Sequence, residues 1–132
     1  MGLYDDIYYD GKKGILELKH LFDYDLKKIP LDLINNVKEL TFYNCFFDRI
    51  PFEFYKIEKL SIESCKYIKY IPDHFINLKE ININGCENLK ELPNTLINLN
   101  KIYISYRSDI IIPENIIKIP NIYINKFKIK NK

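Results

Sequence analysis

The hydrophobic positions of this chain follow one pattern that returns about every 21 residues. An Ile-Pro or Leu-Pro pair marks each return, at Pro30, Pro51, Pro72, Pro93 and Pro113. An apolar residue stands three positions after each proline, and an apolar-x-x-apolar-x-apolar segment follows, as in Val37, Leu40 and Phe42. Apolar residues at alternate positions predict a short strand with one buried and one exposed face. Because a unit of this size cannot bury its apolar side alone, we expect the units to stack into a coil whose strands form a parallel sheet.

A cysteine closes the strand segment in three successive units. These cysteines are Cys45, Cys65 and Cys86, and Arg107 and Phe127 take the same place in the next two units. The stretch LKEININGCENLKELP, residues 78–93, carries the whole pattern. It is similar to the leucine-rich repeat, in the form found in plant resistance-type repeats and in the cysteine-containing class, with about 21 residues per repeat. The resemblance covers residues 29–127, and its strength lies in the agreement of five copies at many positions.

The resemblance implies an α/β-type repeat solenoid, a short arc with a parallel β-sheet on its concave face. We expect little regular helix on the convex side, because segments such as PDHFINL are too short for one. Asp10 and Gly11 stand between two strand-like runs and predict a hairpin-like N-terminal cap. The whole chain, 1–132, is expected to be a single domain with a cap (1–14), a degenerate repeat (15–28), regular repeats (29–125) and a basic tail (126–132).

The composition favours strands and a location inside the cell. The chain has 132 residues with 11 Tyr and no Ala, and aromatic residues favour strands whereas alanine is the best helix former. No apolar run is long enough to cross a bilayer, and Asp5 and Asp6 stand where a signal peptide needs an apolar stretch. Three cysteines do not suggest a disulfide framework, so we expect a cytoplasmic protein.

The candidate catalytic and metal-binding residues have simpler structural explanations. A column of Cys45, Cys65 and Cys86 could supply three thiolates to a metal, but zinc sites in sequences show closely spaced cysteine pairs, which are absent here. We interpret the column as a structural ladder of buried thiols. His74 follows Asp73, a pair that can orient an imidazole for base catalysis, yet the pattern places no nucleophile near it. We therefore predict no enzyme activity, no metal and no cofactor.

The outward positions of the strands are free to carry function, because the repeat fixes only the inward ones. Alternation predicts partner-binding positions at Thr41, Tyr43, Ser61, Glu63, Asn82, Asn84, Tyr103, Ser105, Tyr106, Tyr123 and Asn125. Tyr103 and Tyr123 are expected in one column, with Tyr106 at the strand exit, as an aromatic contact site. Cross-strand pairing that stabilises the sheet is an equal alternative for these tyrosines. The resemblance implies a non-catalytic protein-protein interaction module that binds a protein partner through the concave face.

The basic C-terminal end provides a further hypothesis. Residues 101–132 hold seven Lys or Arg and two Asp or Glu, and the tail contains Lys126, Lys128, Lys130 and Lys132. Such a segment can bind nucleic acid or an acidic surface. Lysine is abundant throughout the chain, however, and charged side chains also keep an edge strand from recruiting another chain, so nucleic acid is the weaker prediction. A self-associating structural protein is the third alternative, and we expect a monomer or weak homo-oligomer.

Overall fold

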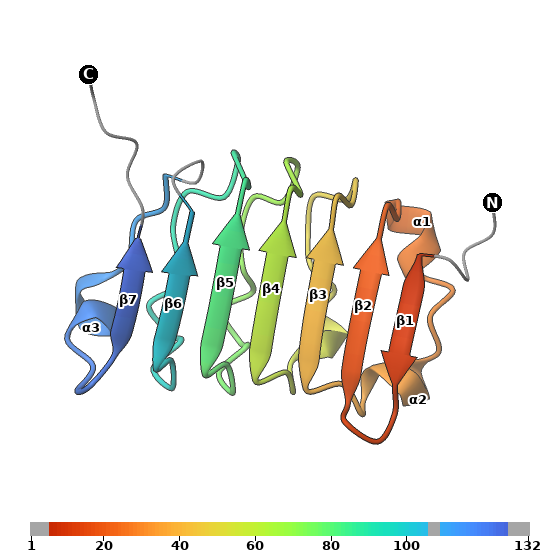
Figure 1. Cartoon of the computed structure of the whole chain (residues 1–132), viewed down its shortest axis with the longest axis horizontal. Coiled ribbons are helices and arrows are strands. Elements are labelled where there is room, and N and C mark those ends of the chain that lie inside the picture. Colours follow the sequence, from red (N-terminus) through yellow and green to blue (C-terminus); the bar gives the residue numbers. More distant parts are fainter. Residues whose placement is uncertain (1–5, 106–108, 127–132) are drawn as a thin grey trace.

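The chain forms one continuous sheet of seven strands in a computed structural model that describes residues 6–105 and 109–126. The strands are β1 (Ile7–Asp10), β2 (Ile15–Lys19), β3 (Glu39–Tyr43), β4 (Lys59–Glu63), β5 (Glu80–Asn84), β6 (Lys101–Ile104) and β7 (Tyr123–Lys126). They lie side by side in chain order, with β1 antiparallel to β2 and all later neighbours parallel (Figure 1). A chain that adds one parallel strand per turn is a coil, so the predicted stacking of repeats is confirmed.

The first strand covers the N-terminal edge of the sheet. β1 and β2 form a hairpin in which Asp10 lies opposite Ile15. The Asp10 carboxylate accepts hydrogen bonds from the backbone N–H groups of Lys12, at 3.0 Å, and Lys13, at 3.2 Å. Aspartate favours such turns because its side chain can bond the backbone a few residues on. The predicted hairpin cap is confirmed, and it pairs the edge that β2 would otherwise leave open.

Helical structure is limited to single turns, and Figure 1 shows α2 and α3 behind the sheet. The elements are α1 (Asp23–Leu26), α2 (Leu31–Ile34), η2 (Phe52–Phe54), which is a 3₁₀ turn, and α3 (Glu114–Ile117). Pro30, Pro51 and Pro113 stand directly before three of these turns, with φ values of −62°, −57° and −58°. A fixed φ near these values suits the start of a helix. The prediction of little regular helix is confirmed.

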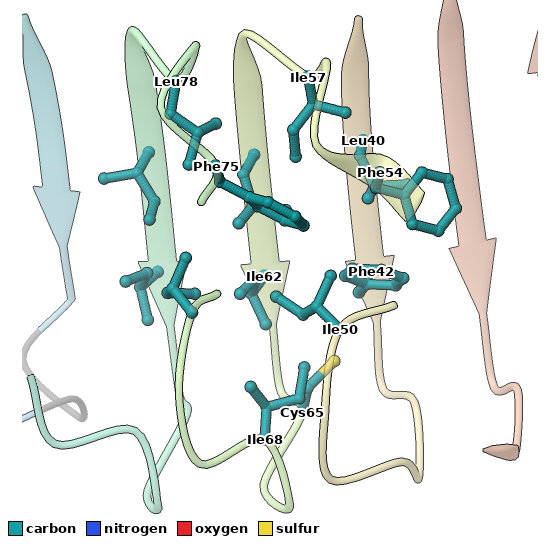
Figure 2. Packing of buried hydrophobic residues seen from close by; sticks show 14 of the residues in the cluster. Leu40, Phe42, Ile50, Phe54, Ile57, Ile62, Cys65, Ile68, Phe75 and Leu78 are labelled. Carbon is teal, nitrogen blue, oxygen red and sulfur yellow. The ribbon is translucent and has the colours of Figure 1, made fainter. Parts of the chain in front are cut away.

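Each turn of the coil buries side chains from its strand and from its returning loop. Figure 2 shows the loop residues Phe54 and Phe75 over the strands that carry Phe42 and Ile62, and all four are at most 1% exposed. Burying one such side chain contributes about 1.5–3 kcal/mol to folding, so every turn depends on its neighbours for most of its stability. The half-buried Leu33 is an exception among the positions three residues after proline.

A left-handed residue follows three of the parallel strands and turns the chain toward the core. Asn44, Ser64 and Gly85 have φ values of 50°, 56° and 70°. The backbone N–H of Ser64 donates to the Asn84 carbonyl oxygen at 2.8 Å, and the Asn44 N–H makes the equivalent bond to the next strand. The residue after each of them is a buried cysteine. This bend therefore brings the cysteine side chain into the interior.

The last strand is shifted by two residues from its predicted register, which corrects the expected tyrosine column. Tyr123 lies opposite Lys101, and Asn125 lies opposite Tyr103. The prediction that Tyr103 and Tyr123 share one column is therefore wrong. It assumed that the fifth repeat has the same loop between its buried isoleucine and its strand as the other repeats.

A β-turn between α3 and β7 is the physical reason for the shift. The N–H of Ile122 donates to the Ile119 carbonyl oxygen at 3.2 Å. Pro120 and Asn121 stand between these residues, and Asn121 has a φ of 62°. Proline followed by a left-handed residue is typical of a type II turn. Because this turn delays the strand, Lys126 takes the last inward position of β7 in place of an apolar residue.

Candidate protein-interaction surface

The outer side of the sheet, here called the sheet face, presents the side chains that alternate with the buried ones. The strand register arranges them in three columns that cross the strands. The first column contains Glu39, Lys59, Glu80, Lys101 and Tyr123; the second contains Thr41, Ser61, Asn82, Tyr103 and Asn125; the third contains Tyr43, Glu63 and Asn84. The predicted contact positions among them are Tyr123 and all residues of the second and third columns, and they therefore lie on one surface.

The first column is a ladder of alternating charge that the sequence analysis did not identify. Lys59 Nζ lies 3.8 Å from Glu39 Oε1 and 3.3 Å from Glu80 Oε2. Lys101 Nζ lies 3.6 Å from Glu80 Oε1. Opposite charges at paired positions stabilise neighbouring strands, although an exposed ion pair contributes only about 0–1 kcal/mol. A second ladder of this kind runs through Lys38, Glu58 and Lys79.

Tyr103 and Tyr123 meet although they occupy different columns. Their ring centroids are 5.5 Å apart, and the ring planes are inclined by 53°. Tyr123 is 50% exposed and Tyr103 is half-buried. Neither hydroxyl has a hydrogen-bond partner among the residues that the structure describes. The pair thus presents aromatic surface and two hydroxyl groups at the β6–β7 end of the sheet face. Tyr106, predicted beside it, lies outside the described residues.

A second aromatic group lies at the other end of the sheet face. Tyr43 is 38% exposed, and its ring stands edge-on to the His20 ring with 5.7 Å between the centroids. His20 Nδ1 lies 3.1 Å from Asp6 Oδ1. Tyr43 is one of the predicted contact positions, whereas His20 is not, because it belongs to the first, irregular repeat. The positive φ of His20, 59°, places it at the position that Asn44 occupies one turn later.

The remaining predicted contact residues differ in how available they are. Asn82 and Asn84 are exposed, whereas Thr41 and Ser61 are half-buried between their neighbours. Ser105 Oγ accepts a hydrogen bond from the Gly85 N–H at 3.2 Å, so its side chain ties two turns together. Of these five residues, the two asparagines have the side chains most open to a partner.

The three cysteines form a buried ladder beyond the strand ends. Cys45 Sγ donates to the Leu18 carbonyl oxygen at 3.4 Å, and Cys86 Sγ donates to that of Ile62 at 3.7 Å. Cys65 Sγ accepts the Cys45 N–H at 3.4 Å. The hydrogen bond with Cys65 and burial raise the pKa of Cys45, and burial raises the pKa of Cys86 to about 11. Both thiols are therefore protonated at neutral pH, whereas metal binding and nucleophilic attack need the thiolate.

The histidine and metal candidates show structural contacts. His74 Nε2 lies 3.0 Å from the Phe52 carbonyl oxygen of the preceding turn, and its ring stands edge-on to Phe75 at 5.2 Å. No group of three His, Cys, Asp or Glu side chains within residues 6–105 and 109–126 is placed to hold a metal ion. Over the same ranges, no helix is long and apolar enough to span a lipid bilayer.

The C-terminal end of the sheet is supported by a lysine. Lys126 Nζ donates a hydrogen bond to the Ile110 carbonyl oxygen at 2.6 Å. This partly buried amine therefore stabilises the end of the coil and is less available to bind a phosphate group. Arg107, Phe127 and the tail lysines at 128, 130 and 132 lie outside the described residues.

Comparison with known proteins identifies the fold. No family model matches the chain, and no curated protein matches it. One solved structure, the leucine-rich repeat domain of the type III effector XopL, superimposes with a TM-score of 0.61 over 89% of this chain, at 16% sequence identity. The fold is that of a leucine-rich repeat. The chain spans 45% of the length of the XopL chain. Solenoids of stacked repeats present an extended concave surface.

Proposed function

We propose that the chain is a non-catalytic protein-protein interaction module that binds its partner at the β5–β7 end of the sheet face. The observation that carries this proposal is the partly exposed pair of Tyr103 and Tyr123 beside the polar side chains of Asn82 and Asn125. Rings held on a rigid sheet lose little conformational freedom when a partner binds, which favours affinity. Removing such an anchor typically costs about 2 kcal/mol or more of binding free energy.

The charge ladder of the first column supports placing the partner on Tyr123, which ends that column, and on the second and third columns. Lys59 and Lys101 already have carboxylate partners. A protein that covers these ion pairs must remove water from them, and this desolvation cost is not offset by a new ion pair. Asn82, Asn84 and Tyr103 carry no charge. Their amide and hydroxyl groups can bond a partner at a smaller desolvation cost.

We also propose a class for the repeats, a role for the cysteines and a cellular setting. The repeats are proposed to be of the cysteine-containing, plant resistance-type class, which the common position of Cys45, Cys65 and Cys86 supports. These thiols are proposed to be structural, in agreement with their burial and their raised pKa values at Cys45 and Cys86. A cytoplasmic setting is proposed because a reducing compartment keeps unpaired thiols reduced.

Affinity capture from native cell extract tests the proposal. The baits are the wild type, the Tyr103→Ala/Tyr123→Ala variant, and Tyr55→Ala as a matched control, since Tyr55 is 43% exposed but follows η2 outside the strands. Circular dichroism first establishes that all three are folded. We expect one protein to be captured by the wild type and the control and lost by the double variant. With that protein purified, the dissociation constant should rise by about 30-fold or more. Equal capture by all three baits would refute the proposed site.

A further inference from the structure

The side of the coil away from the sheet face carries a long groove. It has a volume of about 1440 Å³ and is lined by five successive turns, at Ile29, Ile50, Ile71, Leu92 and Pro113. This volume exceeds the roughly 300–1,000 Å³ of pockets that hold small molecules. Turns stack about 4.8 Å apart, so four steps span about 19 Å, the length of about six residues of extended chain. The dimensions therefore fit an extended peptide.

The groove exposes the apolar side chains that such a peptide would cover. Phe52 is 66% exposed, Ile111 is 65% exposed and Leu31 is 58% exposed, and all three line the groove. Tyr70, 50% exposed, is a fourth lining residue. Large apolar side chains gathered on one surface mark interaction sites in soluble proteins.

The groove is also acidic, in contrast to the chain as a whole. Its lining has five carboxylates and two basic side chains, a formal charge of 2 − 5 = −3 with histidine neutral, whereas the whole chain carries +2. The carboxylates are those of Asp23, Asp48, Glu53, Asp73 and Glu91. Glu53, Asp73 and Glu91 form no ion pair with any residue that the structure describes.

The difference from the sheet face has a structural cause. In the first column, the register places lysines opposite glutamates, and each charge is compensated. In the groove, corresponding loop positions carry Glu53, His74 and Thr95, and the last two bond backbone carbonyl oxygens of the preceding turn. Among the described residues, Glu53, Asp73 and Glu91 thus have no cation of the chain's own, whereas Asp48 Oδ1 lies 3.9 Å from Arg49 Nε.

We infer that this groove binds an extended segment of a partner protein in which lysine or arginine residues alternate with apolar residues. The apolar side chains contact the Ile/Leu-Pro segments and Phe52, and the cations lie near Glu53, Asp73 and Glu91. Alternation suits this arrangement because successive side chains of an extended chain point to opposite sides. The site is separate from the proposed sheet-face site, so one protein can be held at each.

Fluorescence anisotropy with synthetic peptides tests the inference on the full chain. The probe is a labelled peptide of about seven residues in which Lys alternates with Leu. Two control peptides carry Glu in place of each Lys, or Ser in place of each Leu. The groove variants are Glu53→Gln/Asp73→Asn/Glu91→Gln and, separately, Phe52→Ser/Ile111→Ser. The matched control is Glu39→Gln/Glu80→Gln on the sheet face, and circular dichroism verifies that each variant is folded.

We expect the Lys-Leu peptide to bind the wild type, and binding to weaken with added salt. Each groove variant should weaken it by about tenfold or more, and the sheet-face control by less than about twofold. Neither control peptide should bind comparably. Absence of binding, equal binding of the Glu peptide, or loss of binding in the sheet-face control alone would overturn the inference. Self-association that only the groove variants abolish would assign the groove to a second copy and would also overturn it. The Tyr103→Ala/Tyr123→Ala variant should bind the peptide normally, which separates this site from the sheet-face site.

Discussion

The left-handed backbone conformation of the residue that follows a strand leads us to predict opposite effects on stability for two substitutions. Ser64 and Gly85 occupy the same place in successive repeats, with φ values of 56° and 70°. A residue with a side chain pays about 1–2 kcal/mol for the left-handed conformation, which glycine adopts without this cost. We expect Ser64→Gly to stabilise the protein and Gly85→Ala to destabilise it.

The size of both effects depends on the folded and the unfolded state of the chain. Glycine makes the unfolded chain more flexible, which costs about 0.4–1 kcal/mol and offsets part of the gain. The net change is therefore about 0.5–1 kcal/mol in each direction. Nothing else should contribute much, because the Ser64 side chain is exposed and a Cβ at Gly85 would be 3.8 Å from its nearest neighbours in Ser64. The 2.8 Å bond from the Ser64 N–H to Asn84 is retained by glycine.

Thermal and urea unfolding monitored by circular dichroism measure the effects. For 132 residues the unfolding entropy is about 0.28 kcal/mol/K, so 1 kcal/mol shifts Tm by about 3–4 °C. Ser64→Gly should raise Tm by about 2–4 °C, and Gly85→Ala should lower it by a similar amount. Ser61→Gly, at the centre of β4, is the control and should destabilise by about 0.5–1 kcal/mol. A lower Tm for Ser64→Gly would show that backbone strain does not govern this position.

Three other perturbations test the core, the thiols and the charge ladder. Phe75→Ala should lower the free energy of unfolding in urea by about 3–5 kcal/mol, and the exposed Phe52→Ala by less than about 0.5 kcal/mol, because only Phe75 leaves a cavity. The pKa of Cys86 rises from 9.0 to about 11 on folding, so its thiol contributes stability that is present below pH 9 and lost as the pH rises to 11. At about 1.4 kcal/mol per pH unit, the stability difference between the wild type and Cys86→Ala should shrink by ~2.7 kcal/mol across this window, and a constant difference would contradict the assignment. Lys59→Ala should cost about 0.5–1 kcal/mol at low salt and markedly less at 1 M salt, and an equal cost at both would show that the ion pairs to Glu39 and Glu80 do not carry the effect.

The repeat spacing was sufficient to predict the strands β3 to β6 and their inward residues. In a coil of equal turns, apolar residues that recur at a constant interval stack on one another and are buried in the interior. Leu60, Ile81 and Ile102 recur at that interval and are fully buried. The hairpin cap was predictable for a local reason, because the Asp10 carboxylate binds backbone N–H groups of the turn, residues 11–14, which Gly11 begins.

The register of the last strand was mispredicted because the repeat interval alone does not show where the preceding loop forms an extra turn. Pro120 and Asn121 are residues that favour turns, and this local signal could have indicated the extra turn before β7. It was outweighed by the isoleucines at 119, 122 and 124, which continue the repeat spacing. The charge ladder also has a sequence signal, since the side chain alternates from Glu39 to Lys59 to Glu80 at the repeat interval.

The groove could not be predicted from the repeat, and the reason also explains why its charge is uncompensated. Strand residues are held opposite one another by backbone hydrogen bonds, so opposite charges one repeat apart in sequence are brought into contact. The loop residues two positions after each proline also recur at the repeat interval, but they are Glu53, His74 and Thr95, so this position supplies Glu53 with no lysine or arginine. Within the described residues, charge is therefore compensated along the first column of the sheet and left uncompensated at Glu53, Asp73 and Glu91. In this chain the consequence is two chemically different surfaces, an aromatic and polar one on the sheet and an acidic, apolar one behind it, which suit different partners.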